Sequence, residues 1–241
     1  MIAMSARAAA ALLLVAGCTR PVEQLRLANE DLAAGRLPAL EARIAEGYRD
    51  AVGGKAELRD GLEELLRGAT GLEIRTPELT ALRTEGPDRG TTLQGKLELS
   101  FEDKERGGWT LTGPLDVELD HSGQIRSGYL ADLRDLVGLF KARRAALEAN
   151  DAAQLGALLH PDYRDGDRDK DATIRRLAQD LEGTPVRLRP LSYWAELRGM
   201  DAHVDERYEL RVGEEPRRAV ARFTLRKSAG RWRIFAGLYP P

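Results

Sequence analysis

Apolar residues recur first at helical and then at strand spacing in the second half of the chain. Residues 136–150 carry apolar side chains every three or four positions, which predicts a helix, and two shorter helices are predicted at 152–160 and 171–182. Asp151 and Asp171 stand where side chains cap helix starts. Alternating apolar and polar residues then predict four strands, at 186–197, 202–212, 217–227 and 231–239.

The first half of the chain repeats this pattern. GYRDAVGGK at 47–55 returns as DYRDGDRDK at 162–170, and residues 25–66 align without a gap onto 140–181. Apolar positions coincide along this alignment, as expected if both copies bury the same helix faces. Strand segments also correspond, 93–101 with 204–212 and 122–130 with 229–239. The repeat predicts an α+β chain made of two similar domains.

Three helices followed by a curved antiparallel sheet resemble the cone-shaped NTF2-like (SnoaL-like) fold. The resemblance covers nearly the whole chain after its N-terminal segment, in two successive copies, and it lies in the order of the elements and in the helix-helix-loop-helix opening. It implies two tandem NTF2-like domains, each with N-terminal helices packed on a curved antiparallel sheet. We expect the first domain at residues 25–136 and the second at 137–241, joined by a short and mostly helical link.

The repeated Tyr-Arg-Asp phrase follows the second predicted helix of each copy. Its tyrosine can cover the open end of a core, while Arg49 or Arg164 pairs with a neighbouring acid. A phenol, a guanidinium and a carboxylate together can also bind a polar ligand. We favour the structural role, in which the doubling records a gene duplication.

The N-terminal residues are typical of an export signal. Arg7 precedes an apolar run that is too short to span a bilayer as a helix. The segment Val15-Ala16-Gly17-Cys18 resembles the lipobox of bacterial lipoproteins. The resemblance implies a signal peptide at residues 1–17 and an acylated Cys18, followed by a short tether, with residues 18–24 forming this anchor segment.

Cys18 is the only cysteine of the chain. An exported protein with a single thiol has no disulfide partner for it, and acylation accounts for the residue. The alternative is an ordinary secreted protein whose signal happens to contain a cysteine. Thr19, where an aspartate would imply retention in the inner membrane, implies the periplasmic face of the outer membrane.

Composition supports a folded body on that anchor. Hydrophobic residues make up 42% of the chain and charged residues 32%, and no second apolar stretch approaches membrane-spanning length. The net charge of −2 is small. We expect a membrane partner through the anchor, an envelope protein or anionic envelope polymer as a further partner, and no nucleic acid.

The two halves carry opposite charge. Residues 19–136 sum to −7 and residues 137–241 to +4. Strand 115–119 alternates leucine and valine with acids, whereas strand 219–226 exposes arginines. Three interpretations stay open: the two sheet faces pack together as an internal pseudo-dimer, both faces are solvated, or arginines bind lipid phosphates or an anionic polymer. The arginines concerned are Arg222, Arg226, Arg231 and Arg233.

Few residues are suited to catalysis or metal binding. His203 and Asp205 are two apart on a predicted strand, so they point the same way and can form an acid/base pair in a cone pocket. The acidic loop 165–171 has the spacing of calcium ligands, but Lys170 takes the place of the turn glycine and Arg176 that of the bidentate glutamate. We therefore expect a solvated loop and no metal.

Aromatic residues of the second copy can line a pocket or fill a core. The residues concerned are Trp194, Tyr208, Trp232 and Phe235. We predict a non-catalytic binding or scaffolding module of the cell envelope, without a cofactor. The alternative is a small-molecule carrier, or an isomerase or dehydratase, that uses the cone pocket of the second domain.

Overall fold

The structure, a computed structural model, describes residues 21–84, 90–183, 185–212 and 215–238 of the 241-residue chain. Its elements form two series of similar order. The first is α2 (Pro21–Ala33), α3 (Leu37–Glu41), α4 (Lys55–Leu66), β1 (Thr70–Arg75), β2 (Thr80–Thr84), β3 (Gly90–Glu102), β4 (Gly108–Leu119) and β5 (Ile125–Ser127). The second is α5 (Ala131–Glu148), α6 (Ala152–Ala157), a short hairpin of β6 (Arg164–Asp165) and β7 (Arg168–Asp169), α7 (Lys170–Leu181), β8 (Val186–Arg198), β9 (Asp201–Val212), β10 (Glu215–Ser228) and β11 (Arg231–Ala236).

The predicted order of helices and strands is confirmed, with local differences at helix starts. Asp151 caps α6 by accepting the Gln154 amide at 2.8 Å, as expected. Asp169, and not the predicted Asp171, caps α7, because the β6–β7 hairpin ends there. Residues 21–24 of the predicted tether 18–24 belong to α2, where Pro21 suits the first turn of a helix, and residues 18–20 lie outside the described residues.

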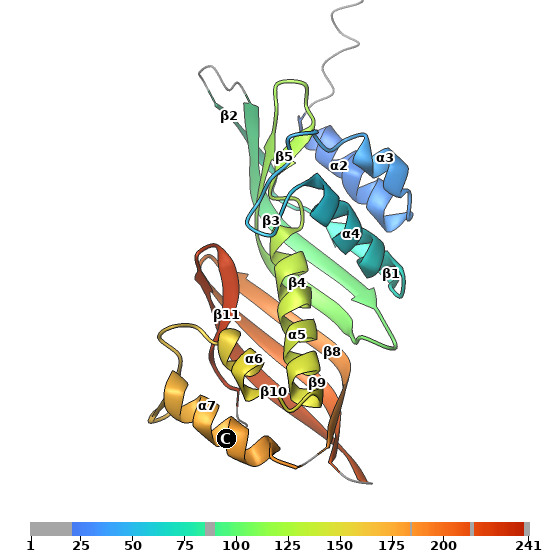
Figure 1. Cartoon of the computed structure of the whole chain (residues 1–241). Coiled ribbons are helices and arrows are strands. Elements are labelled where there is room, and N and C mark those ends of the chain that lie inside the picture. The colour runs from blue at the N-terminus through green and yellow to red at the C-terminus, as the bar shows by residue number, and fades with distance from the viewer. Residues whose placement is uncertain (1–20, 85–89, 184, 213–214, 239–241) are drawn as a thin grey trace, which may run out of the picture.

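Nine strands form one curved sheet, in the order β1-β3-β4-β8-β9-β10-β11, with β2 paired to β3 and β5 to β4 (Figure 1). All pairings are antiparallel except that of β4 with β8, where Gly108–Thr112 run parallel to Ser192–Glu196. Of the three interpretations of the charged sheet faces, the one in which the two halves pack face to face is therefore wrong. They join edge to edge instead, because this pairing satisfies the backbone groups that two separate sheet edges would leave open.

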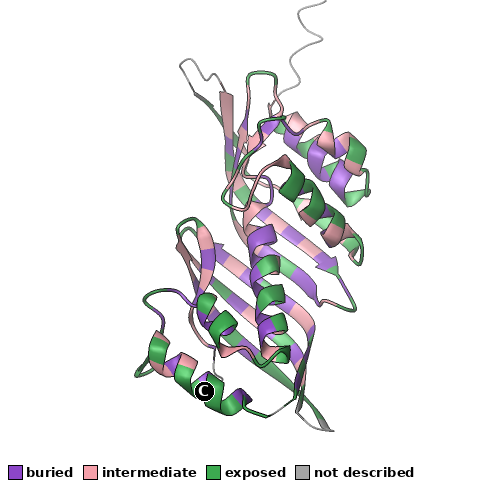
Figure 2. Ribbon diagram, in the orientation of Figure 1, coloured by how far each residue is buried: buried purple, intermediate pink, exposed green. Residues whose placement is uncertain are grey.

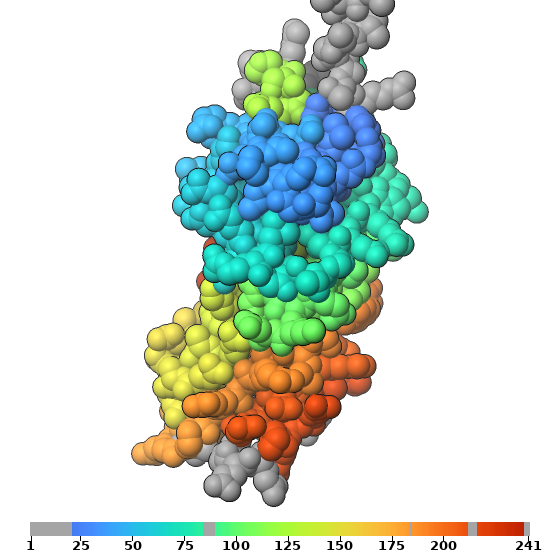
Figure 3. Space-filling model, turned by 90° about the vertical axis from the view of Figure 1, so that its right-hand side faces the viewer, coloured from blue at the N-terminus to red at the C-terminus, as the bar shows by residue number. Residues whose placement is uncertain are grey.

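Helices cover one face of this sheet, which we call the inner face, and leave the other, outer face bare (Figures 1 and 2). The space-filling view shows the first series at one end of an elongated molecule and the second at the other (Figure 3). Buried apolar side chains of both series form one continuous core. No helix in the described part of the chain is long and apolar enough to cross a membrane.

Helix α5 belongs to both halves. Its buried positions include Leu133, Leu136 and Phe140 on one stripe, but also the charged side chains of Arg134 and Arg143. The Arg134 guanidinium pairs with Asp50 of the first half, and Arg143 lies in the core of the second. The predicted boundary between residues 136 and 137 thus falls inside this helix, which holds the halves in a fixed relation.

Candidate functional site

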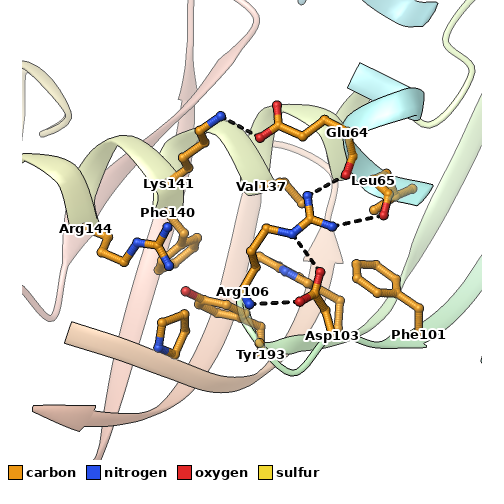
Figure 4. A pocket seen from close by; sticks show the side chains of 13 residues that line it. Glu64, Leu65, Phe101, Asp103, Arg106, Val137, Phe140, Lys141, Arg144 and Tyr193 are labelled. Atoms are coloured by element: carbon orange, nitrogen blue, oxygen red, sulfur yellow. Dashed lines mark hydrogen bonds and ion pairs between the residues drawn. The ribbon is translucent and has the colours of Figure 1, made fainter. Parts of the chain in front are cut away.

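A pocket lies where the two halves meet, between α5 and the inner face of the sheet (Figure 4). Its volume is about 90 Å³, enough for several water molecules or a small planar group. The end of α4, the β3–β4 hairpin, α5 and β8 all contribute to it. Its lining residues include Phe101, Asp103, Arg106, Trp109, Phe140, Lys141, Arg144 and Tyr193.

The floor of this junction pocket is aromatic. Trp109 of β4 and Tyr193 of β8 are register partners across the parallel seam, and their rings stack with centroids 4.3 Å apart. Phe140 of α5 packs against both rings, at 5.9 Å and 5.0 Å. Such pairs contribute about 0.5–1.5 kcal/mol each beyond the area they bury. The cluster both closes the seam and offers a flat apolar surface.

Arg106 is held in place by neighbours on the pocket wall. Its guanidinium donates to the Asp103 carboxylate at 2.7 Å and to the carbonyl oxygens of Glu64 and Leu65 at the end of α4. Cations are favoured at helix C-termini, where carbonyl groups lack partners. The charge of Arg106 is thus already compensated, and we assign it to structure.

Burial acts to raise the pKa of Asp103, but hydrogen bonds from the Arg106 and Glu105 amides and from the Arg106 side chain outweigh it. The net result is a pKa below that of a free aspartate. A carboxylate with a lowered folded-state pKa adds stability above its unfolded pKa of about 3.9, and this stability is lost as the pH falls through the folded value.

Substituting Asp103→Asn should therefore destabilise the protein most at pH 5 and above, and progressively less as the pH falls below about 4. Urea unfolding of both proteins at pH 7, 5 and 3 measures this difference. Asp60→Asn, at an exposed position of α4, is the control and should show a small difference at every pH. A difference for Asp103→Asn that stays constant from pH 7 to 3 would contradict the assignment.

Two further cations reach the pocket from α5, and they differ in their surroundings. Lys141 pairs with Glu64 at 2.5 Å, and this hydrogen bond lowers the pKa of the glutamate. Arg144 is half-buried and has no acid within ion-pair distance and no hydrogen-bond partner among the described residues. Figure 4 shows it beside Phe140 at the edge of the pocket. Arg144 is therefore the cation that is free to bind an anion.

A buried ion pair lies behind the aromatic floor. Glu206 of β9 is fully buried and accepts from Arg143 at 2.7 Å and from the Tyr193 hydroxyl at 3.0 Å. Arg143 also lies over the Phe223 ring at 4.7 Å. Burial raises the pKa of Tyr193, so the phenol stays protonated as a donor. The pair orients Tyr193, which forms part of the aromatic floor of the pocket.

The predicted acid/base pair lies elsewhere. His203 and Asp205 do point the same way from β9, but toward the outer face, where His203 is exposed and Asp205 half-buried. They do not enter the inner-face pocket, because side chains alternate along a strand and the even-numbered residues of β9 face the core. The core-facing residues of β9 include Ala202, Val204, Glu206 and Tyr208.

None of the four aromatic residues predicted to line a pocket is among the residues that line the junction pocket. Trp194 is 45% exposed on the outer face, because it is adjacent to inward-facing Tyr193. Trp232 and Tyr208 are buried in the core, and Phe235 contacts the Arg226 guanidinium at 4.2 Å. Trp109 and Tyr193, which the pattern did not single out, form the floor instead.

The four predicted arginines do not form one surface. Arg226 pairs with Asp201 of the neighbouring strand at 2.7 Å, and Arg222 lies 3.9 Å from Asp205. The other two point to helices: Arg231 pairs with Asp135 of α5, and Arg233 donates to the Ala157 carbonyl of α6. They contact acids and carbonyls near their own strands and not the acidic strand of the first half.

The Tyr-Arg-Asp phrase has the same local structure in both halves. The tyrosine hydroxyl donates to the aspartate two residues later, for Tyr48 and again for Tyr163. Each phrase also has a lysine that closes its loop. Lys55 donates to the Ile44 carbonyl at 3.0 Å, and Lys170 donates to the Leu159 carbonyl at 3.2 Å.

These interactions hold the segments that follow α3 and α6, which is a structural role, but the predicted pairing of Arg49 or Arg164 with an acid is not found among the described residues. Arg49 and Arg164 are exposed, and it is the aspartate of the phrase that is anchored. The acidic loop 165–171 forms the β6–β7 hairpin and the cap of α7. Across the described residues, no group of three or more His, Cys, Asp or Glu side chains is arranged to hold a metal ion.

Comparison of the sequence with protein families finds no match, and comparison with curated proteins finds no significant match. Among solved structures, Bd1075 of Bdellovibrio bacteriovorus is similar at 12% identity, with 46% of this chain and 42% of that chain covered and a TM-score of 0.41. Protein Rv3472 of Mycobacterium tuberculosis, of unknown function, matches at 14% identity over 45% and 74%, with a TM-score of 0.41.

An NTF-2 like protein of unknown function from Shewanella oneidensis MR-1 matches at 16% identity, over 43% of this chain and 94% of that chain, with a TM-score of 0.36. The chain spans less than half the length of Bd1075. Each of these three matches covers less than half of the present chain, which is a large curved, mostly antiparallel sheet with helices on one face.

Proposed function

We propose that this protein is a lipid-anchored, non-catalytic binding module of the bacterial cell envelope, which holds a small anionic molecule in the junction pocket. Its body consists of two tandem NTF2-like domains, at residues 25–136 and 137–241, and its anchor is an acylated Cys18 at the periplasmic face of the outer membrane. Cys18 lies outside the described residues, three positions before the start of α2.

The same backbone hydrogen bond occurs within each half, which supports the duplication. In the first half the Ala45 amide donates to the Ile125 carbonyl at 2.9 Å, and in the second the His160 amide donates to the Ile234 carbonyl at 2.8 Å. These residues follow α3 and α6 and pair with the last strand of their own half. Together with the closing lysines, they give both halves the same contact between helices and sheet.

The observation that carries the proposed binding function is the state of Arg144. It is a half-buried guanidinium without a partner among the described residues, and it lies beside an aromatic floor. A guanidinium offers a fork of donors that matches a carboxylate or phosphate, and a partly desolvated site strengthens that attraction. The flat floor of Trp109 and Tyr193 favours a ligand whose other part is apolar and planar.

Native mass spectrometry of the chain from Thr19 onward, isolated from periplasm, tests the proposal. We expect a small anion bound at one per chain in the wild type and lost in Arg144→Gln. Arg175→Gln, which removes an exposed arginine from α7, should keep it. Thermal unfolding checks that both variants are folded. A clean protein mass for the wild type, or equal retention by both variants, would contradict a ligand at this pocket.

A small-molecule enzyme is the second candidate, and the Tyr193 hydroxyl favours it. The Tyr193 hydroxyl lines the pocket and donates a hydrogen bond to the buried Glu206 carboxylate, so a phenol that can act as a general acid lies within reach of a bound molecule. If the bound molecule is a substrate, Tyr193→Phe should abolish its conversion to product, while the variant still binds it through Arg144. If neither the wild type nor the variant converts the molecule, the enzyme function is wrong and only the binding function stands.

A further inference from the structure

The outer face of the second half carries a group of arginines that the junction pocket does not use. They form what we call the arginine face, which consists of Arg187 and Arg189 of β8 and Arg207 and Arg211 of β9. All four are exposed. In the described part of the chain, none has an acid within ion-pair distance or a hydrogen-bond partner for its side chain.

The register of the strands brings these charges together. Arg187 lies directly opposite Arg211, and Arg189 lies opposite Glu209, an acid on the same face. Glu209 is itself 3.5 Å from Arg218 of β10. Like charges directly opposite on neighbouring strands are destabilising, so stability does not account for this arrangement. Elsewhere on the same face Arg226 has an acid at 2.7 Å, which shows what a paired arginine looks like in this sheet.

An exposed indole lies on the same face. Trp194 of β8 is 45% exposed, although most tryptophan side chains in folded proteins are largely buried. Its neighbours across the strands are Asp205 on one side and Thr110, across the parallel seam, on the other. The outer face therefore has a flat apolar ring on the same strands as the arginine face.

The place of the arginine face in the molecule narrows the choice of partner. Helix α2, with which the described chain begins, lies at one end of the molecule, and the C-terminal end of β9 lies at the other (Figures 1 and 3). Arg211 is the next-to-last residue of β9, and Arg187 lies opposite it at the start of β8. With the acyl anchor proposed above, this end points away from the membrane. A single exposed tryptophan is also little apolar surface for insertion into a bilayer.

We propose that the outer face of β8 and β9 binds an acidic polysaccharide that carries carboxylate or phosphate groups. The arginine forks bind the acidic groups, and Trp194 stacks on the apolar face of a sugar ring. The partner is polymeric because the free cations extend along two strands and not around one pocket. This surface is separate from the junction pocket, so either can fail without the other.

Titration calorimetry with polygalacturonate and with a phosphorylated mannan tests this proposal on the chain from Thr19 onward. We expect binding to at least one of them that weakens with added salt, and at least a tenfold loss of affinity in the Arg189→Glu, Arg211→Glu double variant. The matched control, Arg67→Glu with Arg83→Glu, makes the same change in charge at exposed positions of the first half and should bind as the wild type does.

Trp194→Ala separates a polysaccharide from other polyanions. Its affinity for the polysaccharide should fall several-fold, while its affinity for poly-L-glutamate, which has charge but no rings, should not change. Vesicles of phosphatidylglycerol and phosphatidylcholine should bind no more tightly to the wild type than to the double variant. Tighter binding to vesicles than to either polysaccharide would overturn the proposal in favour of a membrane surface.

Stability measurements distinguish a loss of the binding surface from unfolding of the variant. Arg211→Glu converts the Arg187–Arg211 pair into opposite charges, so its thermal midpoint should rise while its binding falls. If the charge reversals unfold the chain, the milder Arg189→Gln with Arg207→Gln replaces them and should still weaken binding. The proposal is wrong if the wild type binds neither polysaccharide, or if it binds fully methyl-esterified polygalacturonate as tightly as the acid.

Discussion

Replacing Gly237 with alanine should lower the free energy of unfolding by about 3 kcal/mol or more, the sum of a strained backbone and an overpacked contact. Gly237 has φ of +89°, and a Cβ built there would lie 1.9 Å from the carbonyl oxygen of Arg222. Gly128 is its counterpart in the first half, with φ of +83° and a Cβ position 2.2 Å from the Asp116 carbonyl oxygen. In both halves the chain leaves its last strand so close to the neighbouring strand that only glycine fits.

Urea unfolding followed by circular dichroism measures the effect for Gly237→Ala and Gly128→Ala. Gly138→Ala is the matched control, because its Cβ meets nothing within 4 Å and it lies inside α5. Alanine is the better helix former, so this variant should gain roughly 0.5–1 kcal/mol. Wild-type stability in Gly237→Ala would show that the strand end can shift, and that the close approach is not required.

Removing Glu206 alone should destabilise the protein by about 3–5 kcal/mol, because it leaves the Arg143 guanidinium buried without a counter-charge. The two side chains are 1% and 6% exposed. The Arg143 Nε already has no hydrogen-bond partner within the described structure, so loss of Glu206 would leave the guanidinium still less satisfied. The Tyr193 hydroxyl would lose its acceptor in the same variant.

A double-mutant cycle separates the ion pair from the packing around it. Glu206→Leu together with Arg143→Leu should recover much of the stability that either single change loses, since a buried pair can often be replaced by apolar side chains at little net cost. Glu209→Leu, on the outer face of the same strand, is the control and should change stability only slightly. Additive losses in the double variant would mean that the two charges do not act as a unit.

The same substitutions bear on the junction pocket. Tyr193 lines the pocket and also stacks on Trp109, so its position depends on the hydrogen bond to Glu206 as well as on the seam. Loss of ligand in Glu206→Leu at a temperature where the chain is still folded would show that the buried pair orients Tyr193 on the floor of the pocket. Arg144, one residue after Arg143, is the direct contact with the ligand in the proposed function. Arg144→Gln should therefore lose the ligand with little loss of stability, whereas Glu206→Leu should lose stability as well.

Local patterns in the sequence predicted the elements well. Alternation of apolar and polar residues located β8, β9, β10 and β11 to within a few residues, because the period of a strand depends only on which side chains face a core. Asp151 was identified as a cap for the same kind of reason, since a cap acts over three residues. The doubled Tyr-Arg-Asp phrase pointed to a repeated loop, and its hydrogen bonds recur in both halves.

Those patterns did not show which face of the sheet a given side chain lies on. His203 and Asp205 were correctly placed on one side of β9, but the side was wrong, because the core-facing series of that strand includes the charged Glu206. In β8 the neighbouring aromatic residues Tyr193 and Trp194 point to opposite faces, and alternation alone does not say which is buried. Arg143 and Arg144 differ in the same way, by one step around a helix.

The sequence by itself determined the order of helices and strands, the recurrence of the Tyr-Arg-Asp phrase and the cap at Asp151, since these depend on residues within a few positions of one another. Only the tertiary structure decided that β4 pairs with β8 to make one sheet, and which charges are paired or free. Such contacts join distant parts of the chain, as Arg143 and Glu206 do across 63 positions. Their partners are chosen by which edges and buried groups remain unsatisfied once the local elements have formed.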